Sequence, residues 1–390
     1  MTMKLLEVNT PATKKEFLQF PVRLYKNEEN WIRPLDKDIE AVFDPAQNKT
    51  FRNGECTRWI LQDNQGTTIG RVAAFVNHNT SKKNDQPTGG MGFFECVEDK
   101  EAAFMLLDQC RSWLEERGME AMDGPINFGE RDKWWGLLVD GFHEPNYCMP
   151  YNFPYYREFL EDYGFQLYFK QFTYKRPMGS EVGLSEGMKA RAQRTLSNPD
   201  YEYRHLRKSE ADKAPEYFRS VYNQGWGKHA GVKEISSLQA KNLFNQLKPV
   251  IDWRLIWFGF YQGEPVAFMI MIPELNQIFK YVNGKLDLWG KVKFLYHKLR
   301  GTCKRAIGLV FGVVPSHQAK GIEAALIVKY TEMAWKKSFP YKELEMNWIG
   351  DFNPKMMRVS EQIGAEIYKT HHTYRKLFDS KKEFKRMPII

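Results

Sequence analysis

Hydrophobic and polar residues alternate along this chain in blocks of changing period, and the order of the blocks is the first guide to its fold. Residues 57–62 (TRWILQ) and 68–77 (TIGRVAAFVN) are strand-like runs on either side of a polar turn at 64–66, which predicts a hairpin. Residues 100–117 carry apolar side chains at helical spacing and stop at Gly118, which predicts a helix. Strands and helices that follow one another in this way indicate an α/β chain.

The same reasoning predicts the remaining elements, and they fall into two series. The first series adds strands near 90–97, 121–126 and 165–176, helices near 14–25 and 155–163, and a packed aromatic and proline-containing loop at 20–39. The second has strands at 201–206, 253–272 (a hairpin), 306–314, 342–348 and 365–377, and helices near 209–223, 236–249, 322–337 and 354–363. The order of elements in the first series therefore recurs in the second.

The repeat is visible in individual residues as well. In each half an Asn, a Gly and two Tyr follow one another at nearly equal spacing: Asn152, Gly164, Tyr168 and Tyr174, then Asn353, Gly364, Tyr368 and Tyr374. The two hairpins also match, GRVAAF against EPVAFM. We therefore predict two copies of one fold. The division is 1–176, a linker at 177–200, 201–380 with a basic insertion at 273–305, and a basic tail at 381–390.

Composition and charge indicate where in the cell such a chain works and which kind of partner it favours. The chain has 390 residues, of which 43% are hydrophobic, so it can bury two sizeable cores. It contains no apolar run long enough for a transmembrane helix and no apolar secretory leader, which predicts a cytoplasmic protein. Five scattered cysteines without metal-ligand spacing predict no disulfide framework and no metal. The net charge of +9 favours an anionic partner.

The stretch 308–327 (GLVFGVVPSHQAKGIEAALI) is the strongest candidate for binding an anion. An apolar strand ends near Pro315, a polar turn follows, and a helix opens at Ile322. The free amides of a helix N-terminus attract phosphate, and Gly321 lets the backbone approach it closely. An ordinary strand–turn–helix without a ligand is the alternative explanation of the same residues.

Motifs in the second half resemble the Gcn5-related N-acetyltransferase (GNAT) superfamily. VVPSHQAKGI is similar to its acyl-CoA signature, and Asn353, Glu361 and Gly364 match the spacing of its late helix. The resemblance implies an α/β (α+β) chain of two tandem GNAT-like domains, each a mixed, mostly antiparallel sheet flanked by helices. It implies acetyl-CoA or a longer acyl-CoA as co-substrate, contacted by Gly312, Val313, Val314, Gln318, Ala319, Lys320, Gly321, Ile322 and Asn353.

Two positions depart from the pattern of the superfamily. The last signature position is Glu323 instead of Gly or Ala, and Ser360 stands where a catalytic tyrosine is often found. The first copy departs further, because its corresponding turn (FFECVEDKEAAFML) lacks glycine and carries Glu95, Glu98 and Asp99. Carboxylates there repel a pyrophosphate, so we expect the first copy not to bind CoA and the second copy to catalyse.

Acyl transfer to an amine requires positioning, a proton acceptor and stabilisation of an oxyanion. Glu345 and Asn347 share one face of the strand ELEMNW, and with Tyr374 they are our candidate catalytic residues. The alternative for Glu345 is a solvent-facing position on that strand. His317, His371 and His372 are further candidates for proton transfer, or else packing residues.

The basic insertion carries information of its own. Residues 276–305 hold eight Lys or Arg against one Asp, interleaved with large apolar side chains. This pattern suits an anionic membrane surface at the inner face of the membrane, an acyl carrier protein, or packing on the parent domain. Nucleic acid is disfavoured because no nucleic-acid-binding module accompanies the segment. The insertion resembles a bacterial branch related to N-acyltransferases that form dihydroceramide.

The leading hypothesis is therefore an acyl-CoA-dependent N-acyltransferase whose acceptor is an amine, with a long-chain sphingoid-like amine implied by the resemblance. One alternative is a tandem-GNAT transferase that takes its acyl group from aminoacyl-tRNA. The other is a non-catalytic module that binds CoA or another ligand, with Glu323 and Ser360 as signs of lost activity.

Overall fold

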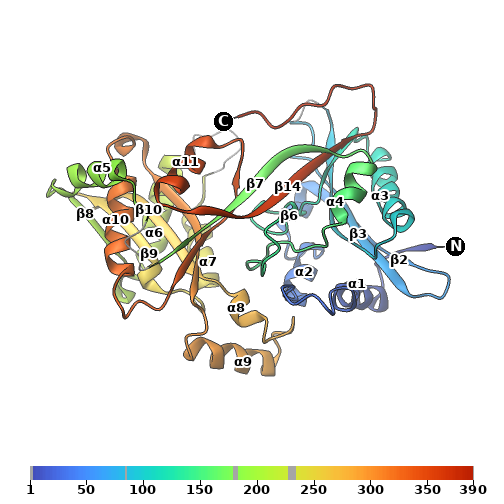
Figure 1. The fold of residues 1–390 in the computed structure, drawn as a ribbon, viewed down its shortest axis with the longest axis horizontal. Helices are drawn as coiled ribbons and strands as arrows, with labels where there is room; N and C mark the ends of the chain where they lie inside the picture. Colours follow the sequence, from blue (N-terminus) through green and yellow to red (C-terminus); the bar gives the residue numbers. More distant parts are fainter. Residues whose placement is uncertain (1–2, 84–85, 179–182, 227–233, 390) are drawn as a thin grey trace.

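The computed structural model describes residues 3–83, 86–178, 183–226 and 234–389, and its two halves follow the predicted series (Figure 1). The strands of the first half are β1 (Lys4–Glu7), β2 (Gly54–Gln62), β3 (Thr68–Asn77), β4 (Thr88–Cys96), β5 (Ala121–Gly124), β6 (Leu137–Asp140) and β7 (Gln166–Pro177). Its helices are α1 (Pro11–Leu24), α2 (Asp36–Val42), α3 (Lys100–Glu115) and α4 (Tyr156–Asp162).

The second half begins after α5 (Glu186–Leu196), the helix of the predicted linker, of which residues 179–182 lie outside the described residues. Its strands are β8 (Tyr201–His205), β9 (Ile256–Tyr261), β10 (Glu264–Pro273), β11 (Arg305–Val313), β12 (Glu343–Met346), β13 (Ile349–Gly350) and β14 (Glu366–Leu377). Its helices are α6 (Ala214–Trp226), α7 (Ser237–Leu247), α8 (Asn276–Phe279), α9 (Leu288–Leu299), α10 (Ile322–Ala334) and α11 (Pro354–Gln362).

All strands join one sheet of 14 strands, in the order β1-β2-β3-β4-β5-β14-β7-β12-β11-β10-β9-β8 with β6 and β13 paired to its centre. Neighbours are antiparallel except β4 with β5 and β11 with β12, which are parallel. Each half contributes helices that cover its part of the sheet. The predicted class, two copies of a mixed and mostly antiparallel sheet flanked by helices, is confirmed.

The two copies exchange their last strands at the centre of the sheet. Strands β7 and β14 run antiparallel side by side across the middle of the molecule (Figure 1). The end of β14, the last strand of the second copy, pairs with β5 of the first copy. The end of β7, the last strand of the first copy, pairs with β12 of the second. Each half is therefore completed by a strand that the other half supplies.

Both faces of the sheet in the second half carry apolar cores. Phe258, Phe268 and Ile270 pack against α6 and α7, while Trp257 and Leu344 pack on the opposite face with α10. This alternation along the strands is what the period-two pattern of the sequence requires. No helix in the described part of the chain is long and apolar enough to span a membrane.

Three features were not foreseen in the sequence. The stretch predicted as a loop at 20–39 contains the start of α2, beyond the predicted helix near 14–25. The segment between the predicted strand at 121–126 and the predicted helix at 155–163 contains β6, and the basic insertion folds into α8 and α9. With seven residues in α2 and four each in β6 and α8, these elements are too short for a period of two or 3.6 to stand out, whereas the apolar residues of α9 do recur at helical spacing.

Candidate functional site

Strands β11 and β12 start together and then separate, which opens a split in the sheet of the second half. They pair from Arg305 with Glu343 to Gly308 with Met346, and the amide of Asn347 donates to the carbonyl of Gly308 at 2.9 Å. Strand β11 then continues to Val313 without β12 beside it. Its residues 308–311 are half-buried, so this side of the strand is open.

A β-bulge lies at the point where the strands separate. Ile270 of β10 faces Val310, but the next residue, Met271, faces Gly308, so Leu309 is an extra residue in β11. A bulge bends its strand and re-aims the residue that it inserts. The backbone around Leu309 therefore leaves the regular ladder beside Asn347, a feature for which the sequence offered only the flexible Gly308 as a signal.

The predicted cradle follows directly at the end of β11. A single helical turn at Pro315–His317 leads to Gln318, whose side-chain amide donates to the carbonyl of Val313 at 3.1 Å. Gly321 has φ +86°, the left-handed conformation that favours glycine, and it forms the N-cap of α10. Among the residues that the structure describes, no side chain caps α10, so its first-turn amides have no side-chain acceptor there.

Helix α5 explains the unusual Glu323. Its Arg191 guanidinium lies 4.0 Å from the Glu323 carboxylate, so the negative charge of the signature faces a positive one. Thr195 of the same helix donates to the carbonyl of Lys320 at 2.6 Å. The helix of the linker is thus fastened to the cradle of the second half, a role that its sequence did not indicate.

In α11, the side chains of Asn353 and Ser360 form hydrogen bonds within the helix itself. The side chain of Asn353 accepts from the amide of Met356 at 3.2 Å and so caps the helix. Ser360 is fully buried, and its hydroxyl donates to the carbonyl of Met356 at 3.1 Å. The Ser360 hydroxyl is therefore committed to its own helix, and it does not replace the tyrosine that the motif often carries at this position.

Glu345 lies in a buried network of charges and not on a solvent-facing strand. Its carboxylate accepts from Lys369 at 2.6 Å and from Asn146 at 2.7 Å, and the guanidinium of Arg305 lies 3.0 Å away. Glu345 and its three partners come from four separate segments of the chain. The solvent-facing alternative for Glu345 is wrong, because the residue is 0% exposed. Any acceptor that uses Glu345 as a base has to displace one of these partners.

Glu274, at the end of β10, stands at the edge of this network. Burial raises the pKa of its carboxyl to about 7, and the neighbouring Glu345 acts in the same direction. The amides of Tyr147 and Asn276 donate to it at 3.0 and 2.8 Å. The pKa of Lys369 is lowered, chiefly by burial. No local pattern indicated Glu274, because its surroundings come from segments more than 100 residues apart.

Tyr374 does not belong to this site, and its prediction as a catalytic residue has to be corrected. It pairs with Gly124 of β5, lies in the core of the first half, and donates to Glu161 at 2.9 Å. Lys369, which does contact Glu345, is five residues away along β14, or roughly 17 Å in an extended strand. The cause is the strand exchange, which carries the end of β14 into the other half.

The three histidines are also buried or packed against other side chains. His317 lies between Tyr201 and Tyr261 and shares a hydrogen bond with the Tyr201 hydroxyl at 2.7 Å. His371 is buried, and burial lowers its pKa to about 3. His372 lies beside Tyr374 in the first half. Their packing interpretation fits the structure better than proton transfer in the split.

Comparison with known proteins extends over nearly the whole chain. No protein-family model matches this sequence. It is 28% identical over 380 residues to "Bacterial ceramide synthase" of Caulobacter vibrioides (strain NA1000 / CB15N), covering 96% of this chain and 97% of that protein. It is 24% identical over 367 residues to "Protein YghO" of Escherichia coli (strain K12), covering 93% and 92%.

Among solved structures, the chain superimposes on a tandem GNAT protein from the clavulanic acid biosynthesis pathway. The TM-score is 0.54 at 9% identity, covering 98% of this chain and 100% of that chain. The chain has the tandem GNAT fold. A GCN5-related glucosamine N-acetyltransferase region of a fungal β-N-acetylglucosaminidase gives a TM-score of 0.55 at 10% identity, covering 96% of this chain and 38% of that chain. Both solved structures show the fold of this chain.

The cradle of the first GNAT copy is closed by its own residues. Asp99 caps α3 and accepts from the amides of Glu101 and Ala102 at 2.9 and 3.1 Å, so a carboxylate already occupies the helix N-terminus. The hydroxyl of Tyr155 donates to the carbonyl of Cys96 at 2.8 Å, at the end of β4. The amide of Cys96 in turn donates to the hydroxyl of Tyr156 at 2.8 Å. A side chain of the first copy thus already occupies the helix N-terminus, which stays uncapped in the second copy.

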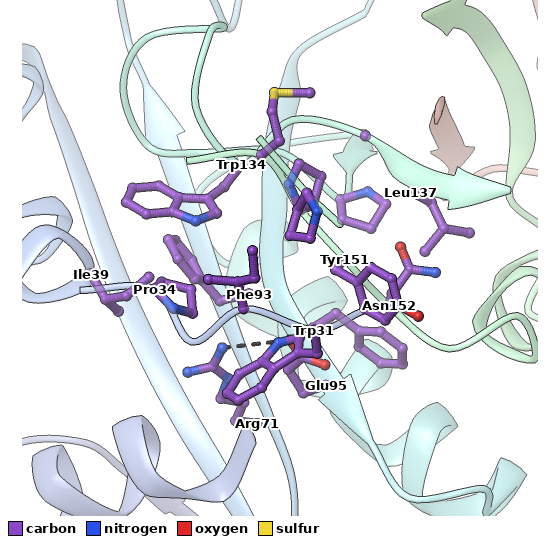
Figure 2. Close-up of a pocket in the computed structure, with 17 residues that line it drawn as sticks. Trp31, Pro34, Ile39, Arg71, Phe93, Glu95, Trp134, Leu137, Tyr151 and Asn152 are labelled. Carbon is purple, nitrogen blue, oxygen red and sulfur yellow. Dashed lines mark ion pairs between the residues drawn. The ribbon is translucent and has the colours of Figure 1, made fainter. Parts of the chain in front are cut away.

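The first GNAT copy nevertheless contains a small, partly open cavity of about 70 Å³. Figure 2 shows its aromatic walls, with Trp31, Phe93 and Trp134 around the buried pair of Arg71 and Glu95, which are 3.6 Å apart. The aromatic and proline-containing stretch at 20–39 contributes to this cavity through Trp31 and its neighbours. The cavity lies beside the N-terminus of α3, which Asp99 already caps, whereas the split of the second copy lies beside the uncapped α10. No cluster of metal-ligating side chains occurs among the residues that the structure describes.

Proposed function

We propose that this protein is an N-acyltransferase that takes its acyl group from acyl-CoA and uses the second GNAT copy. The observation that carries the proposal is the contrast between the two helix ends. Helix α10 starts at Gly321 without a side-chain cap, next to an open split, whereas α3 is capped by Asp99. An uncapped helix N-terminus reached by a glycine turn suits a pyrophosphate.

The proposed binding mode follows the length of the split. The pantetheine arm lies along Gly312, Val313 and Val314, and the pyrophosphate lies at the turn 318–322, where Lys320 is exposed. Asn353 would approach the arm from α11. Arg191 favours this arrangement, because it balances the carboxylate of Glu323 close to the phosphates.

The reaction joins the acceptor nitrogen to the thioester carbonyl carbon, and the carbon–sulfur bond then breaks. CoA leaves as the thiolate, and the ammonium proton of the intermediate passes to a base. The backbone at the bulge beside Leu309 is our candidate for stabilising the oxyanion. Asn347, at the point where the strands separate, is placed to orient the acyl group. Glu345 remains our proposed proton acceptor, on the condition that substrate binding displaces Asn146 or Lys369.

We further propose a long-chain sphingoid-like amine as the acceptor and a long-chain acyl-CoA as the donor. The support is the similarity to the bacterial ceramide synthase over 96% of this chain and 97% of that protein. A ceramide is the amide of a sphingoid amine and a fatty acid, which is the product expected of the reaction described above. A donor bound to acyl carrier protein uses the same thioester chemistry.

The test combines ligand binding with turnover. Acetyl-CoA, palmitoyl-CoA or CoA should raise the melting temperature, and palmitoyl-CoA with sphinganine should give the amide, detected by mass spectrometry. Lys320→Glu should weaken CoA binding on the order of tenfold by placing a carboxylate at the phosphates. Lys337→Glu, past the other end of α10, is the matched control and should leave binding unchanged.

We prefer Lys320→Glu to a substitution of Gly321. A Cβ at Gly321 would meet the carbonyl oxygen of Arg191 at 2.8 Å, so any side chain there disturbs α5 as well as the cradle. Absence of stabilisation by all three CoA compounds would refute the proposal and favour another ligand or donor. Equal affinities for Lys320→Glu and the unmodified protein would show that the phosphates bind elsewhere.

A further inference from the structure

Helix α9 projects from the body of the second half as its outermost element (Figure 1). Its inner side is firmly attached. Gly290 packs so tightly that a Cβ would lie 2.0 Å from the carbonyl oxygen of Lys285, and Phe294 contacts Phe279 with ring centroids 5.6 Å apart. Asp287 caps the helix by accepting from the amide of Gly290 at 2.8 Å. The helix is therefore a fixed part of the fold.

The outer side of α9 is a stripe of large apolar side chains. Six of its twelve residues are large, apolar and between 50% and 78% exposed: Leu288, Trp289, Val292, Leu295, Tyr296 and Leu299. Their spacing of one, four, seven, eight and eleven residues from Leu288 puts all six on one face. Half of the exposed large hydrophobic residues in the described part of the chain thus lie on this single helix. A contiguous exposed patch of this kind marks an interaction surface.

Basic side chains border the apolar stripe on both edges. Lys291 lies along one edge, and Lys293 and Arg300 lie along the other, all of them exposed. Lys285 and Lys304 extend the positive charge beyond the two ends of the helix. Between residues 275 and 322 the one acidic residue is Asp287, whose carboxylate is used in capping. The partner of this face is therefore apolar at its centre and anionic around it.

We propose that α9 docks on the surface of an anionic lipid bilayer, with its apolar stripe below the headgroups and its lysines among the phosphates. Trp and Tyr in the stripe suit the boundary between water and hydrocarbon. Basic residues on both edges match a flat anionic surface, since a small acidic protein would meet one edge only. Twelve helical residues span about 18 Å, less than a hydrocarbon core of roughly 30 Å, so the helix lies in the plane of the surface.

Docking at α9 is compatible with the cradle. Strand β11 starts at Arg305, shortly after α9, and ends at Val313, next to the proposed phosphate site. Its nine residues separate the two sites by about 30 Å. A bilayer at α9 therefore leaves the cradle in water, where CoA is. The docking surface does not depend on acyl transfer, because none of its residues belongs to the split.

The experiment is flotation of the full-length protein with vesicles. Phosphatidylcholine vesicles containing 30% phosphatidylglycerol should carry the protein upward, and pure phosphatidylcholine should carry much less. The triple variant Leu288→Ser, Trp289→Ser, Leu299→Ser should lose at least tenfold in vesicle affinity. Lys291→Glu with Lys293→Glu should weaken binding on the order of fivefold per removed lysine. Binding should also weaken at high salt.

Leu238→Ser is the matched control, since Leu238 is 68% exposed on α7 and lies outside the stripe. It should bind vesicles like the unmodified protein, and all variants should keep the same melting temperature. Failure of the unmodified protein to bind anionic vesicles overturns the proposal, as does full binding by the triple variant. Two results would instead assign the face to a protein: loss of a dimer in the triple variant, or loss of binding to purified acyl carrier protein without any vesicle binding.

Discussion

Carboxylates in the second half differ mainly in how their charge is balanced. Glu345 is fully buried but contacts Lys369, Arg305 and Asn146, whereas Glu323 is half-buried and faces Arg191. Glu274 is nearly as buried as Glu345, but in the described part of the chain only backbone amides donate to its carboxylate. A buried carboxyl without a cation in contact prefers its neutral form. Burial accordingly raises the pKa of Glu274 to about 7.

Glu274→Gln should make stability less dependent on pH. The folded pKa of about 7 lies above the unfolded value of 4.5, so the folded state keeps a proton that the unfolded chain releases. Stability therefore falls as pH rises from about 4.5 to 7, by up to about 3 kcal/mol. A glutamine accepts the same amide hydrogen bonds but carries no charge. Urea midpoints should agree at pH 5 and be higher for the variant at pH 8.

The matched control is Glu366→Gln, at the exposed start of β14. It should change the urea midpoint little at either pH. If Glu274→Gln were equally destabilising at pH 5 and pH 8, Glu274 would be ionised in the folded protein. A cation in contact with the carboxylate would then have to stabilise its negative charge.

At the scale of elements, the two copies differ most at the start of one helix. Helices α3 and α10 occupy equivalent positions, after β4 and β11. In the first copy a side chain caps the N-terminus of the helix, and in the second copy none does. The strands before the two helices nevertheless share a bulge, at Phe93 and at Leu309. The common backbone was retained while the ends of the two helices diverged.

Asp99→Ala tests this difference between α3 and α10. Loss of the cap should destabilise the protein by about 1 kcal/mol, measured from urea midpoints. The shift in melting temperature caused by CoA should be unchanged, because the proposed phosphate site is at α10. Glu98→Ala removes the same charge one residue earlier, where no cap is formed, and should change stability by less than about 0.5 kcal/mol. A smaller CoA shift in Asp99→Ala alone would mean that the first copy takes part in binding.

The elements themselves were largely predictable from the sequence, and the contacts between distant ones were not. The repeat, the hairpins and the cradle at 318–322 depend on local spacing, which the chain displays directly. Glu345 could be placed on its strand, but its partners come from segments up to 199 residues away. Tyr374 was assigned to the wrong half because strand pairing across the copies leaves no local signal. Local patterns specify elements, and packing decides which of them meet.

At the scale of the whole molecule, the exchanged strands join the two copies into one continuous sheet. The centre of the sheet, β5-β14-β7-β12, alternates strands of the two halves, so neither half has a complete sheet without the other. Arg375 on β14 forms a bidentate pair with Asp123 on β5, with distances of 2.6 and 2.8 Å. The Arg375 guanidinium also lies 3.7 Å from the ring centroid of Tyr168 on β7. This one side chain therefore links three strands at the junction of the copies.

Arg375→Met should destabilise both halves together. The substitution keeps apolar volume but leaves the partly buried Asp123 without its cation, a change that costs up to about 3–5 kcal/mol. Because the strands are exchanged, hydrogen exchange followed by mass spectrometry should show equal loss of protection in β5 and in β12, more than one strand away. Lys382→Ala, which removes a surface ion pair with Glu120, is the control and should cost less than about 1 kcal/mol. Loss of protection confined to β5 would mean that the halves unfold independently. The strand exchange would then join the two halves in one sheet without making them unfold together.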